Sequence, residues 1–244
     1  MRRWGLLCAV LFLVGCSSEP PPAVVSNEPL ALGSALGIDL PTDARDVSME
    51  LKGSHLDFIA RYYRDPTSRW PPLSAAEAQA VSSVGLRLVA LWESRAQNPS
   101  YFSYASGYAD AQSAYRQARA IGQPPGSAIY FAVDYNAPSR DVEGTIDHYF
   151  RGVLAGLITE AGGHQPEYRI GVYGSGSVCG YLKGARLVQL TWLSNSTAWE
   201  GYGGFSDWDI RQGMKSRNLS FSHDSNEARG DYGGFLVGSK ASAS

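Results

Sequence analysis

The chain has 244 residues, of which 44% are hydrophobic and 18% are charged, and its formal net charge at pH 7 is −2. These proportions describe a globular protein and exclude the strongly basic surface of a typical nucleic-acid-binding domain, so we expect no nucleic-acid partner. The 14 tyrosines and 6 tryptophans suit a site that stacks on sugar rings, although tyrosines also fill mixed protein cores.

The N-terminus has the pattern of an export signal. In "MRRWGLLCAVLFLVGC" two arginines precede an apolar run that is too short to span a bilayer and that ends at Cys16. This resembles a bacterial lipoprotein signal, which predicts removal of residues 1–15, lipidation of Cys16 and a membrane-anchored location in the cell envelope. The alternative is an ordinary secretory signal cleaved nearby, and the arginine pair leaves export by the Sec or the twin-arginine route open.

Residues 16–33 read as a Pro-rich tether between this signal and a globular domain over residues 34–240. About 210 residues after the tether are enough for one sizeable core. Cys179 is the single cysteine of that domain, so we expect no intrachain disulfide and interpret Cys179 as a small buried residue.

The first half of the domain alternates strand and helix patterns. Ser74 followed by Glu77 is a capping-box pattern and predicts a helix that stops at Gly85. Tyrosines and alanines at helical spacing predict a second helix that begins near Tyr104 and ends at Gly122. The apolar runs around these helices predict four strands: "ALGIDL", "LDFIARYY", "LRLVALWE" and "AIYFAVDYN".

The second half has fewer helices. A helical face from Val142 to Leu157 ends at the glycine pair 162–163, and a short helix around residues 178–182 ends at Gly184. Strand-like runs account for most of the rest: "YRIGVYG", "RLVQLTWL", "DWDIRQG" and "LSFSHD". The gaps between the last three runs are too short or too glycine-rich for crossover helices.

Eight strands alternating with helices in one α/β domain favour a TIM-type (β/α) barrel over an open doubly wound sheet. The pattern predicts an irregular barrel of about five β/α units followed by three helix-poor strands. An open sheet would need a phosphate-binding glycine loop after an early strand, and "GIDLPTD" offers none.

In such barrels the active site lies where the strands end. Four carboxylates stand at these positions, and we predict them to be catalytic: Asp39, Glu93, Asp134 and Asp224. The other polar and aromatic residues near the strand ends are predicted to bind substrate: Arg61, Tyr62, Tyr63, Asn136, Tyr173, Trp192 and Gln212. A single carboxylate after a strand is usually a helix cap or turn residue, but four with aromatic neighbours are harder to explain that way.

Paired carboxylates with aromatic walls suit glycoside hydrolysis, in which one carboxyl protonates the glycosidic oxygen and a second acts as nucleophile, as base or as a stabilising charge. The four histidines are scattered and form no metal-binding pair, so we expect neither a metal nor a cofactor. His223 is the one histidine near the predicted rim. It is either a functional residue or a hydrogen-bonded loop residue.

Several stretches also resemble a known family: "LGIDLP", "DFIARYY", "LSAAEAQAVSSVGLRLVALWE", "YFSYASGYADAQSAYRQARAIGQPPGSAIYFAVDYN" and "SHDSNEARGDYGGF". Together they resemble the glycoside-hydrolase-like domain of unknown function DUF1906, which is related to family 25 lysozymes. The resemblance covers residues 35–238 and implies a TIM-type barrel that acts on peptidoglycan or another envelope glycan. It also implies that Asp39, Asp134 and Asp224 match three acids of the lysozyme cleft.

The chain departs from the lysozyme pattern at Asn136, where the pattern has the glutamate that donates the proton. Glu93 is a candidate replacement, or it is a rim carboxylate paired with Arg95 or Arg61. Three hypotheses therefore stand: a lipid-anchored glycoside hydrolase, a glycan-binding barrel that has lost its acid, and a structural envelope lipoprotein that engages a protein partner. In each case we expect a monomer.

Overall fold

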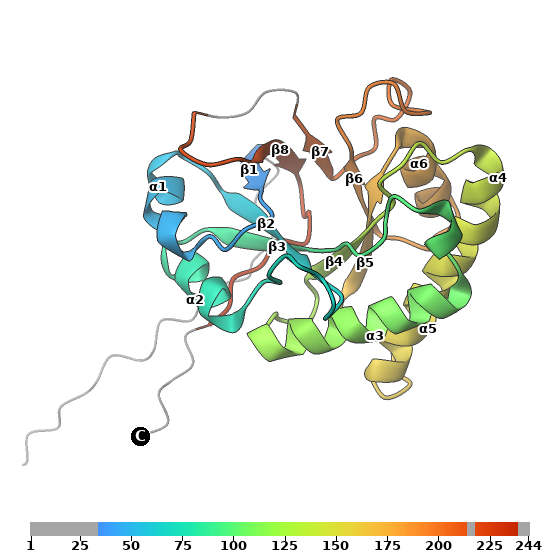
Figure 1. The fold of residues 1–244 in the computed structure, drawn as a ribbon, viewed down its shortest axis with the longest axis horizontal. Coiled ribbons are helices and arrows are strands. Elements are labelled where there is room, and N and C mark those ends of the chain that lie inside the picture. The colour runs from blue at the N-terminus through green and yellow to red at the C-terminus, as the bar shows by residue number, and fades with distance from the viewer. Residues whose placement is uncertain (1–33, 214–217, 239–244) are drawn as a thin grey trace, which may run out of the picture.

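The computed structural model describes residues 34–213 and 218–238, which fold around a closed eight-stranded barrel (Figure 1). The strands follow one another around the barrel in chain order. Their bounds are β1 Ser34–Asp39, β2 Phe58–Tyr63, β3 Arg87–Trp92, β4 Ala128–Ala132, β5 Arg169–Gly174, β6 Leu190–Leu193, β7 Ile210–Gln212 and β8 Asp224–Arg229.

Each connection from β1 to β6 contains a helix, whereas the described residues of the connections after β6 contain none. The helices are α1 Ser48–Gly53, α2 Ala75–Ser83, α3 Tyr104–Ile121, α4 Ser139–Asp141, α5 Asp147–Glu160 and α6 Gly176–Gly184. A π-helical turn, Val142–Ile146, joins α4 to α5, and short 3₁₀ turns span Arg45–Val47 and Pro99–Tyr101. The predicted barrel with a helix-poor final third is confirmed.

The last strand runs against its neighbours. Strands β1 to β7 pair in parallel, whereas β8 pairs antiparallel with both β7 and β1. The predicted strand over residues 219–224 is wrong, because the strand begins at Asp224 and continues to Arg229. Asp224 still reaches the rim that carries the C-terminal ends of the other strands, because an antiparallel strand brings its first residue to that rim.

Side chains alternate between the barrel interior and the layer between strands and helices. The interior cluster includes Phe58, Ala60, Leu91 and Tyr130, and the outer cluster takes the intervening residues. Gly37 leaves room for the ring of Phe58, which a Cβ at residue 37 would overlap. The barrel is therefore a packed core below its rim.

Arg61 and Glu77 form a buried ion pair outside the barrel, between β2 and α2. Ser74 caps α2 as predicted, since its Oγ accepts a hydrogen bond from the Glu77 backbone N–H. The second half of the capping box does not form, because the Glu77 carboxylate instead binds the Arg61 guanidinium and the backbone N–H of Ala44. Glu77 thus fixes a loop and a strand rather than its own helix end.

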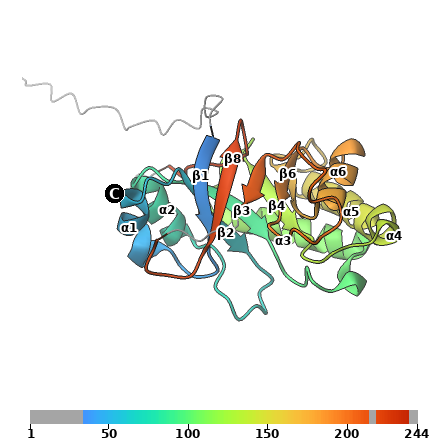
Figure 2. The same cartoon turned by 90° about the horizontal axis from the view of Figure 1, so that it is seen from above.

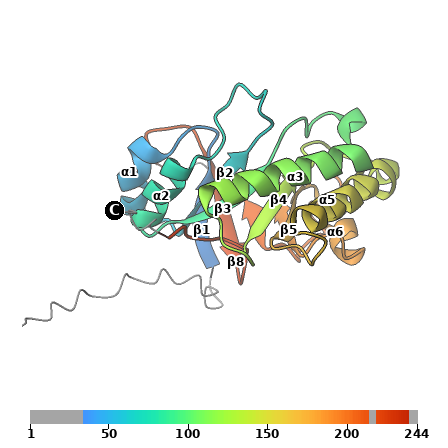
Figure 3. The same cartoon turned by 90° about the horizontal axis from the view of Figure 1, so that it is seen from below.

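Helices α3 and α5 lie side by side across one face of the barrel (Figure 3). Glycines allow this approach: a Cβ on Gly152 would overlap the backbone oxygen of Tyr104, and one on Gly107 would overlap that of Tyr149. In the opposite view β1 and β8 lie toward the viewer with no described helix in front of them (Figure 2). Coverage by helices is therefore one-sided.

The segment after β8 closes the end of the barrel opposite the rim. The Tyr232 ring packs 4.9 Å from that of Phe58, and the Tyr130 hydroxyl donates to the Tyr232 backbone oxygen at 2.9 Å. Phe235 adds a backbone bridge to Leu88. Because Ser34 starts β1 at this same end, the chain enters the barrel on the side away from its rim.

Two predictions concern cysteines and export. Cys179 is fully buried, as predicted, and it is a free cysteine. Cys16 and the predicted signal and tether lie outside the described residues. Within residues 34–213 and 218–238, no helix has the length and apolarity that crossing a membrane would require.

Candidate active site

A single pocket at the barrel rim brings together all four predicted carboxylates. It has a volume of about 300 Å³, at the lower end of the usual range for small-molecule sites. Its lining residues are Asp39, Tyr62, Leu91, Glu93, Ala132, Asp134, Tyr173, Trp192, Asn195, Ser196, Gln212 and Asp224. Eight of the eleven residues predicted from the strand ends are among them.

Arg61 and Tyr63 lie outside this pocket, which corrects their prediction as substrate-binding residues. Both flank Tyr62 on β2, and alternation along the strand sends them to the outer layer while Tyr62 faces the interior. Arg61 is paired with Glu77, and the Tyr63 hydroxyl donates to Gln123 Oε1 at 2.6 Å. Their role is to hold β2 against the helices.

Asn136 is also outside the pocket. Its side chain is exposed, and its Oδ1 accepts a hydrogen bond from the Glu200 backbone N–H at 2.8 Å. The bond joins the loop after β4 to the loop after β6. Asn136 therefore organises the outer rim and does not stand where a proton donor would meet substrate in the pocket.

Asp39 is the centre of a hydrogen-bond network. Its carboxylate accepts from Asn226 Nδ2 at 2.7 Å, from the Tyr62 hydroxyl at 2.9 Å and from Gln212 Nε2 at 3.3 Å. Two of these donors are themselves oriented, since Trp192 Nε1 donates to Asn226 Oδ1 and the Tyr173 hydroxyl donates to Gln212 Oε1. The network fixes Asp39 in one orientation at the base of the pocket.

Burial raises the pKa of Asp39 to about 6. The hydrogen bonds from Asn226, Tyr62 and Gln212 favour the ionised form, while the nearby charge of Asp224 opposes it. Burial wins because Asp39 is only 5% exposed. The group therefore holds a proton in mildly acidic solution.

Glu93 follows β3 and projects into the same pocket with fewer constraints. Its carboxyl accepts no hydrogen bond from a described residue, and its nearest cation is Arg64 Nη1 at 4.0 Å. Burial raises the pKa of Glu93 to about 7; Arg64 opposes the rise, and the charges of Asp134 and Asp39 add to it. Glu93 is thus a carboxylic acid that keeps its proton close to neutral pH.

Asp134 lies just beyond β4, held by the loop after β3. Gln97 Nε2 donates to its Oδ2 at 2.7 Å, and its backbone N–H donates to the Ala96 oxygen at 2.9 Å. Its Oδ1 accepts no hydrogen bond from a described residue, so one oxygen is available to a ligand in the pocket.

Sequence reasoning missed four residues of this site: Gln97, Asn195, Ser196 and Asn226. Asn226 was detectable in principle, since it lies two residues after Asp224 and shares its face of β8. The other three stand on loops, where no periodicity places a side chain. Across the described chain, no group of three or more His, Cys, Asp or Glu side chains is arranged to hold a metal ion.

Comparison with known sequences identifies one family. The family model described as "Rv2525c-like, glycoside hydrolase-like domain" matches residues 49–231. The uncharacterized protein YbfG of Bacillus subtilis is 32% identical over 141 residues, which cover 56% of this chain and 19% of that protein. The chain thus spans about a fifth of the length of this relative.

Solved structures share the fold. The secreted protein Rv2525c of Mycobacterium tuberculosis, solved with HEPES, aligns with a TM-score of 0.68 and 20% identity over 84% of this chain and 99% of that chain. The modular autolysin LytC of Streptococcus pneumoniae, solved with a synthetic peptidoglycan ligand, aligns with a TM-score of 0.53 and 13% identity over 80% of this chain and 46% of that chain. At these identities the likeness is one of fold.

Proposed function

The chain belongs to the family of Rv2525c-like, glycoside hydrolase-like domains, and from that premise we propose that it hydrolyses O-glycosyl bonds of a cell-envelope glycan such as peptidoglycan. The observation that carries this proposal is the pairing, in one rim pocket, of a carboxyl whose pKa lies near 7, Glu93, with a second carboxylate, Asp134. An acid that stays protonated beside a second carboxylate is what glycosidic cleavage requires.

In this mechanism Glu93 donates its proton to the glycosidic oxygen as the bond to the sugar breaks. Positive charge then develops on the ring of the departing sugar, and the free oxygen of Asp134 stabilises it. Glu93, now ionised, can take a proton from the water that completes hydrolysis. Its lack of fixed hydrogen bonds suits this exchange, because its proton is not held by another side chain.

Asp39 acts as a positioning residue in this proposal. Its three hydrogen-bond donors hold it rigidly, and its charge is felt by Glu93, whose pKa it helps to raise. Tyr62 and Tyr173 line the pocket beside it and offer partly exposed ring surface for a sugar.

Release of reducing ends tests the proposal. Purified protein is incubated with peptidoglycan, and Asp134→Asn and Glu93→Gln are compared with the parent and with Asp46→Asn, an exposed carboxylate outside the pocket. We expect losses of about 10²–10⁴-fold for the two pocket variants and none for the control. Full activity in Asp134→Asn would refute the catalytic role of Asp134.

A second candidate function, glycan binding without cleavage, is favoured by the amide at Asn136 in place of the lysozyme glutamate. It predicts that the parent protein binds glycan fragments and releases no reducing ends at any pH. Asn136→Glu would then be the natural repair, yet its side chain lies outside the pocket. We therefore expect no gain of hydrolysis from that variant.

We further propose that the protein is exported and anchored by lipid on Cys16, from the arginines, short apolar run and cysteine of its N-terminus. Cells expressing the full chain are labelled with a fatty-acid analogue and fractionated. We expect labelled protein in the membrane fraction, and loss of both label and membrane association in Cys16→Ser. Membrane association of unlabelled protein would contradict the anchor.

A further inference from the structure

A second pocket adjoins the first and shares Glu93 with it. Its volume is about 470 Å³, and the loops after β2 and β3 form it. Its lining residues are Arg64, Ser68, Arg69, Trp70, Glu93, Ser94, Arg95, Ala96, Gln97 and Asn98. A ligand that extends past Glu93 out of the catalytic pocket therefore enters this one.

Three arginines line the second pocket against one carboxyl. Arg64 reaches Glu93 only at 4.0 Å, and neither Arg69 nor Arg95 forms an ion pair with a described residue. Asp65 lies near Arg95 but turns its carboxylate to Thr67. The positive charge of this pocket is thus largely uncompensated by the residues around it.

Arg64 is the fixed member of the three. Its side chain is 9% exposed, its guanidinium carbon lies 4.3 Å from the centre of the Tyr62 ring, and its Nε donates to no described residue. Reciprocal hydrogen bonds with the Gln117 side chain hold its backbone. A buried guanidinium with an unused donor costs free energy, which a nearby anion would offset.

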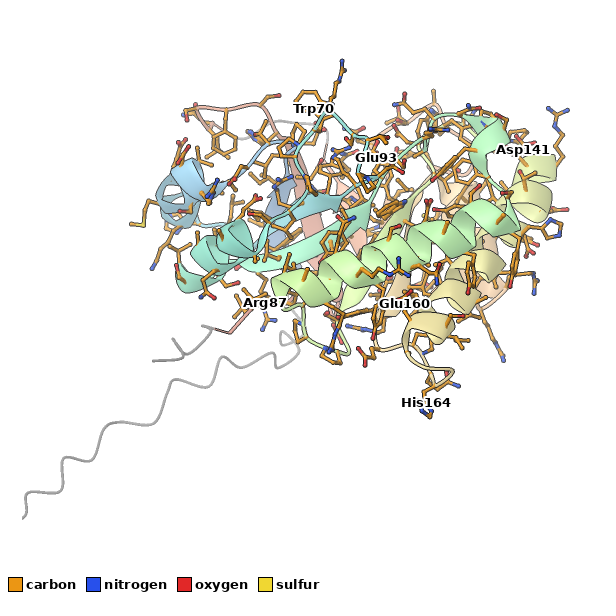
Figure 4. The ribbon with its side chains drawn as sticks, turned by 60° about the horizontal axis from the view of Figure 1, so that its bottom comes forward. Trp70, Arg87, Glu93, Asp141, Glu160 and His164 are labelled. Atoms are coloured by element: carbon orange, nitrogen blue, oxygen red, sulfur yellow. The ribbon has the colours of Figure 1, made fainter. Side chains whose placement is uncertain are left out.

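Trp70 adds an apolar wall to this charged pocket. It is 41% exposed, and the Arg69 guanidinium lies 5.5 Å from the centre of its ring. Figure 4 shows Trp70 and Glu93 on the same side of the molecule, in the loops that rise from β2 and β3. An exposed indole beside cations suits a sugar that carries an acidic substituent.

We propose that this second pocket binds an anionic substituent, a carboxylate or a phosphate, on a sugar next to the one whose glycosidic oxygen Glu93 protonates. The protein therefore selects acidic over neutral glycans. The inference rests on the proposed function, since it assumes a glycan in the first pocket. Arg64 provides the buried charge, and Arg69 and Arg95 close over the anion from the loops.

Occupation of this pocket also affects the proton donor. Arg64 holds the pKa of Glu93 below the value that burial alone would give. An anion beside Arg64 offsets that influence and adds its own negative charge, and both effects raise the pKa of Glu93. An acidic substrate would thereby keep Glu93 protonated at a higher pH than a neutral one.

The test measures binding to two tetrasaccharides that differ only in charge. One alternates N-acetylglucosamine with N-acetylmuramic acid, and the other is the same compound with its carboxyls reduced to alcohols. The full chain in detergent carries Asp134→Asn in every arm, so that no bond is cleaved. Titration calorimetry compares this parent with Arg69→Ala/Arg95→Ala and with Arg116→Ala/Arg140→Ala, which removes the same charge from exposed positions outside the pocket.

We expect the parent to prefer the acidic tetrasaccharide and the Arg69/Arg95 variant to lose about 10- to 100-fold of that affinity. Its affinity for the neutral compound and both affinities of the control should stay within about twofold of the parent. Poly(glycerol phosphate) is also tested as a competitor for bound acidic tetrasaccharide. If it competes more strongly than free acidic tetrasaccharide does, phosphate is the source of the anion. Equal affinity of the parent for the two tetrasaccharides would overturn the inference while leaving glycan binding intact, whereas binding of neither would overturn the proposed function together with it.

Discussion

Asp39 and Asp224 lie directly opposite each other on the antiparallel strands β1 and β8, at the rim of the pocket. Directly opposed side chains on a sheet have Cβ atoms about 4.5–5.5 Å apart, and like charges in such a pair repel. The pair joins the first strand of the barrel to the last. Closure of the barrel is therefore what assembles this half of the site.

Asp224→Asn should lower the pKa of Asp39 from its value of about 6, because it removes the charge that opposes ionisation across the strand pair. Asp224 is exposed, so the fold should be unaffected. Carboxyl carbon shifts of Asp39, followed by NMR during a pH titration, measure the change. Glu227→Gln, on the same strand but paired outward with Arg211, removes an equal charge and should leave Asp39 unchanged. An identical shift in both variants would show that net charge, not the cross-strand pair, is responsible.

Asn226→Ala should act in the opposite direction and raise the pKa of Asp39, since it removes a 2.7 Å hydrogen bond to the ionised carboxylate. It also leaves the buried Trp192 Nε1 without its acceptor, so the free energy of unfolding should fall by about 1–3 kcal/mol. The NMR titration and urea unfolding together measure both effects. A drop in stability with no change in pKa would mean that Asn226 supports packing alone.

The activity of the protein should decline as pH rises through about 7. Glu93 must carry a proton to act as the acid, and burial places its pKa at about that value. Arg64 lowers this pKa, so Arg64→Gln should move the decline in kcat/KM to higher pH. Initial rates between pH 5 and 9 on a soluble glycan measure the profile. A decline that stays at the same pH in Arg64→Gln would exclude Glu93 as its origin.

Glu93 should also make stability depend on pH. Its pKa rises from 4.5 to about 7 on folding, so the folded protein binds this proton more tightly than the unfolded chain does. The stabilising proton is fully present below about pH 4.5 and is lost as pH rises to 7, which lowers the free energy of unfolding by about 2–3 kcal/mol. Glu93→Gln should lack this decrease. Between acidic pH and pH 8 its free energy of unfolding should therefore fall by less than that of the parent. Urea unfolding at several pH values measures this free energy. An equal dependence on pH in the two proteins would refute the prediction.

The glycine contacts between α3 and α5 predict a steric limit. Gly152→Ala should destabilise the protein by about 1–3 kcal/mol, because its Cβ would overlap the backbone oxygen of Tyr104 and force the helices apart. Gly184→Ala is the matched control at the last residue of α6, where a Cβ meets no atom within 4 Å. Thermal unfolding of the two variants measures the contrast. Equal melting temperatures would show that the helix pair adjusts without cost.

Most of the fold was predictable from the sequence because its signals are periodic. Ser74 and Gly122 mark helix ends by local chemistry, and the structure places α2 and α3 between such residues. The last strand was misplaced because residues 219–224 have an apolar pattern, while β8 itself is mostly polar. The polarity of β8 follows from its position, since Asp224 lines the pocket, Asn226 donates to Asp39 beneath it, and Glu227 pairs outward with Arg211.

The site was predictable to the extent that it follows alternation along the strands. Asp39, Tyr62 and Glu93 share the inward parity of their strands, and the same rule, applied strictly, would have excluded Arg61 and Tyr63. Loop residues such as Gln97 were out of reach, because only the folded loop after β3 brings Gln97 to Asp134. The relation of Asn136 to Glu200 was hidden for the same reason, since 64 residues separate them.

The end of the barrel at which β1 begins has a spatial consequence if the anchor on Cys16 is correct. Ser34 lies at the end of β1 opposite Asp39 and the rim, so a lipid on Cys16 would attach to the barrel at the end away from the pocket. Residues 17–33 can extend over at most about 60 Å. The anchored domain would then reach only the glycan nearest its own membrane. The length of residues 17–33 would set how far from the membrane it can reach.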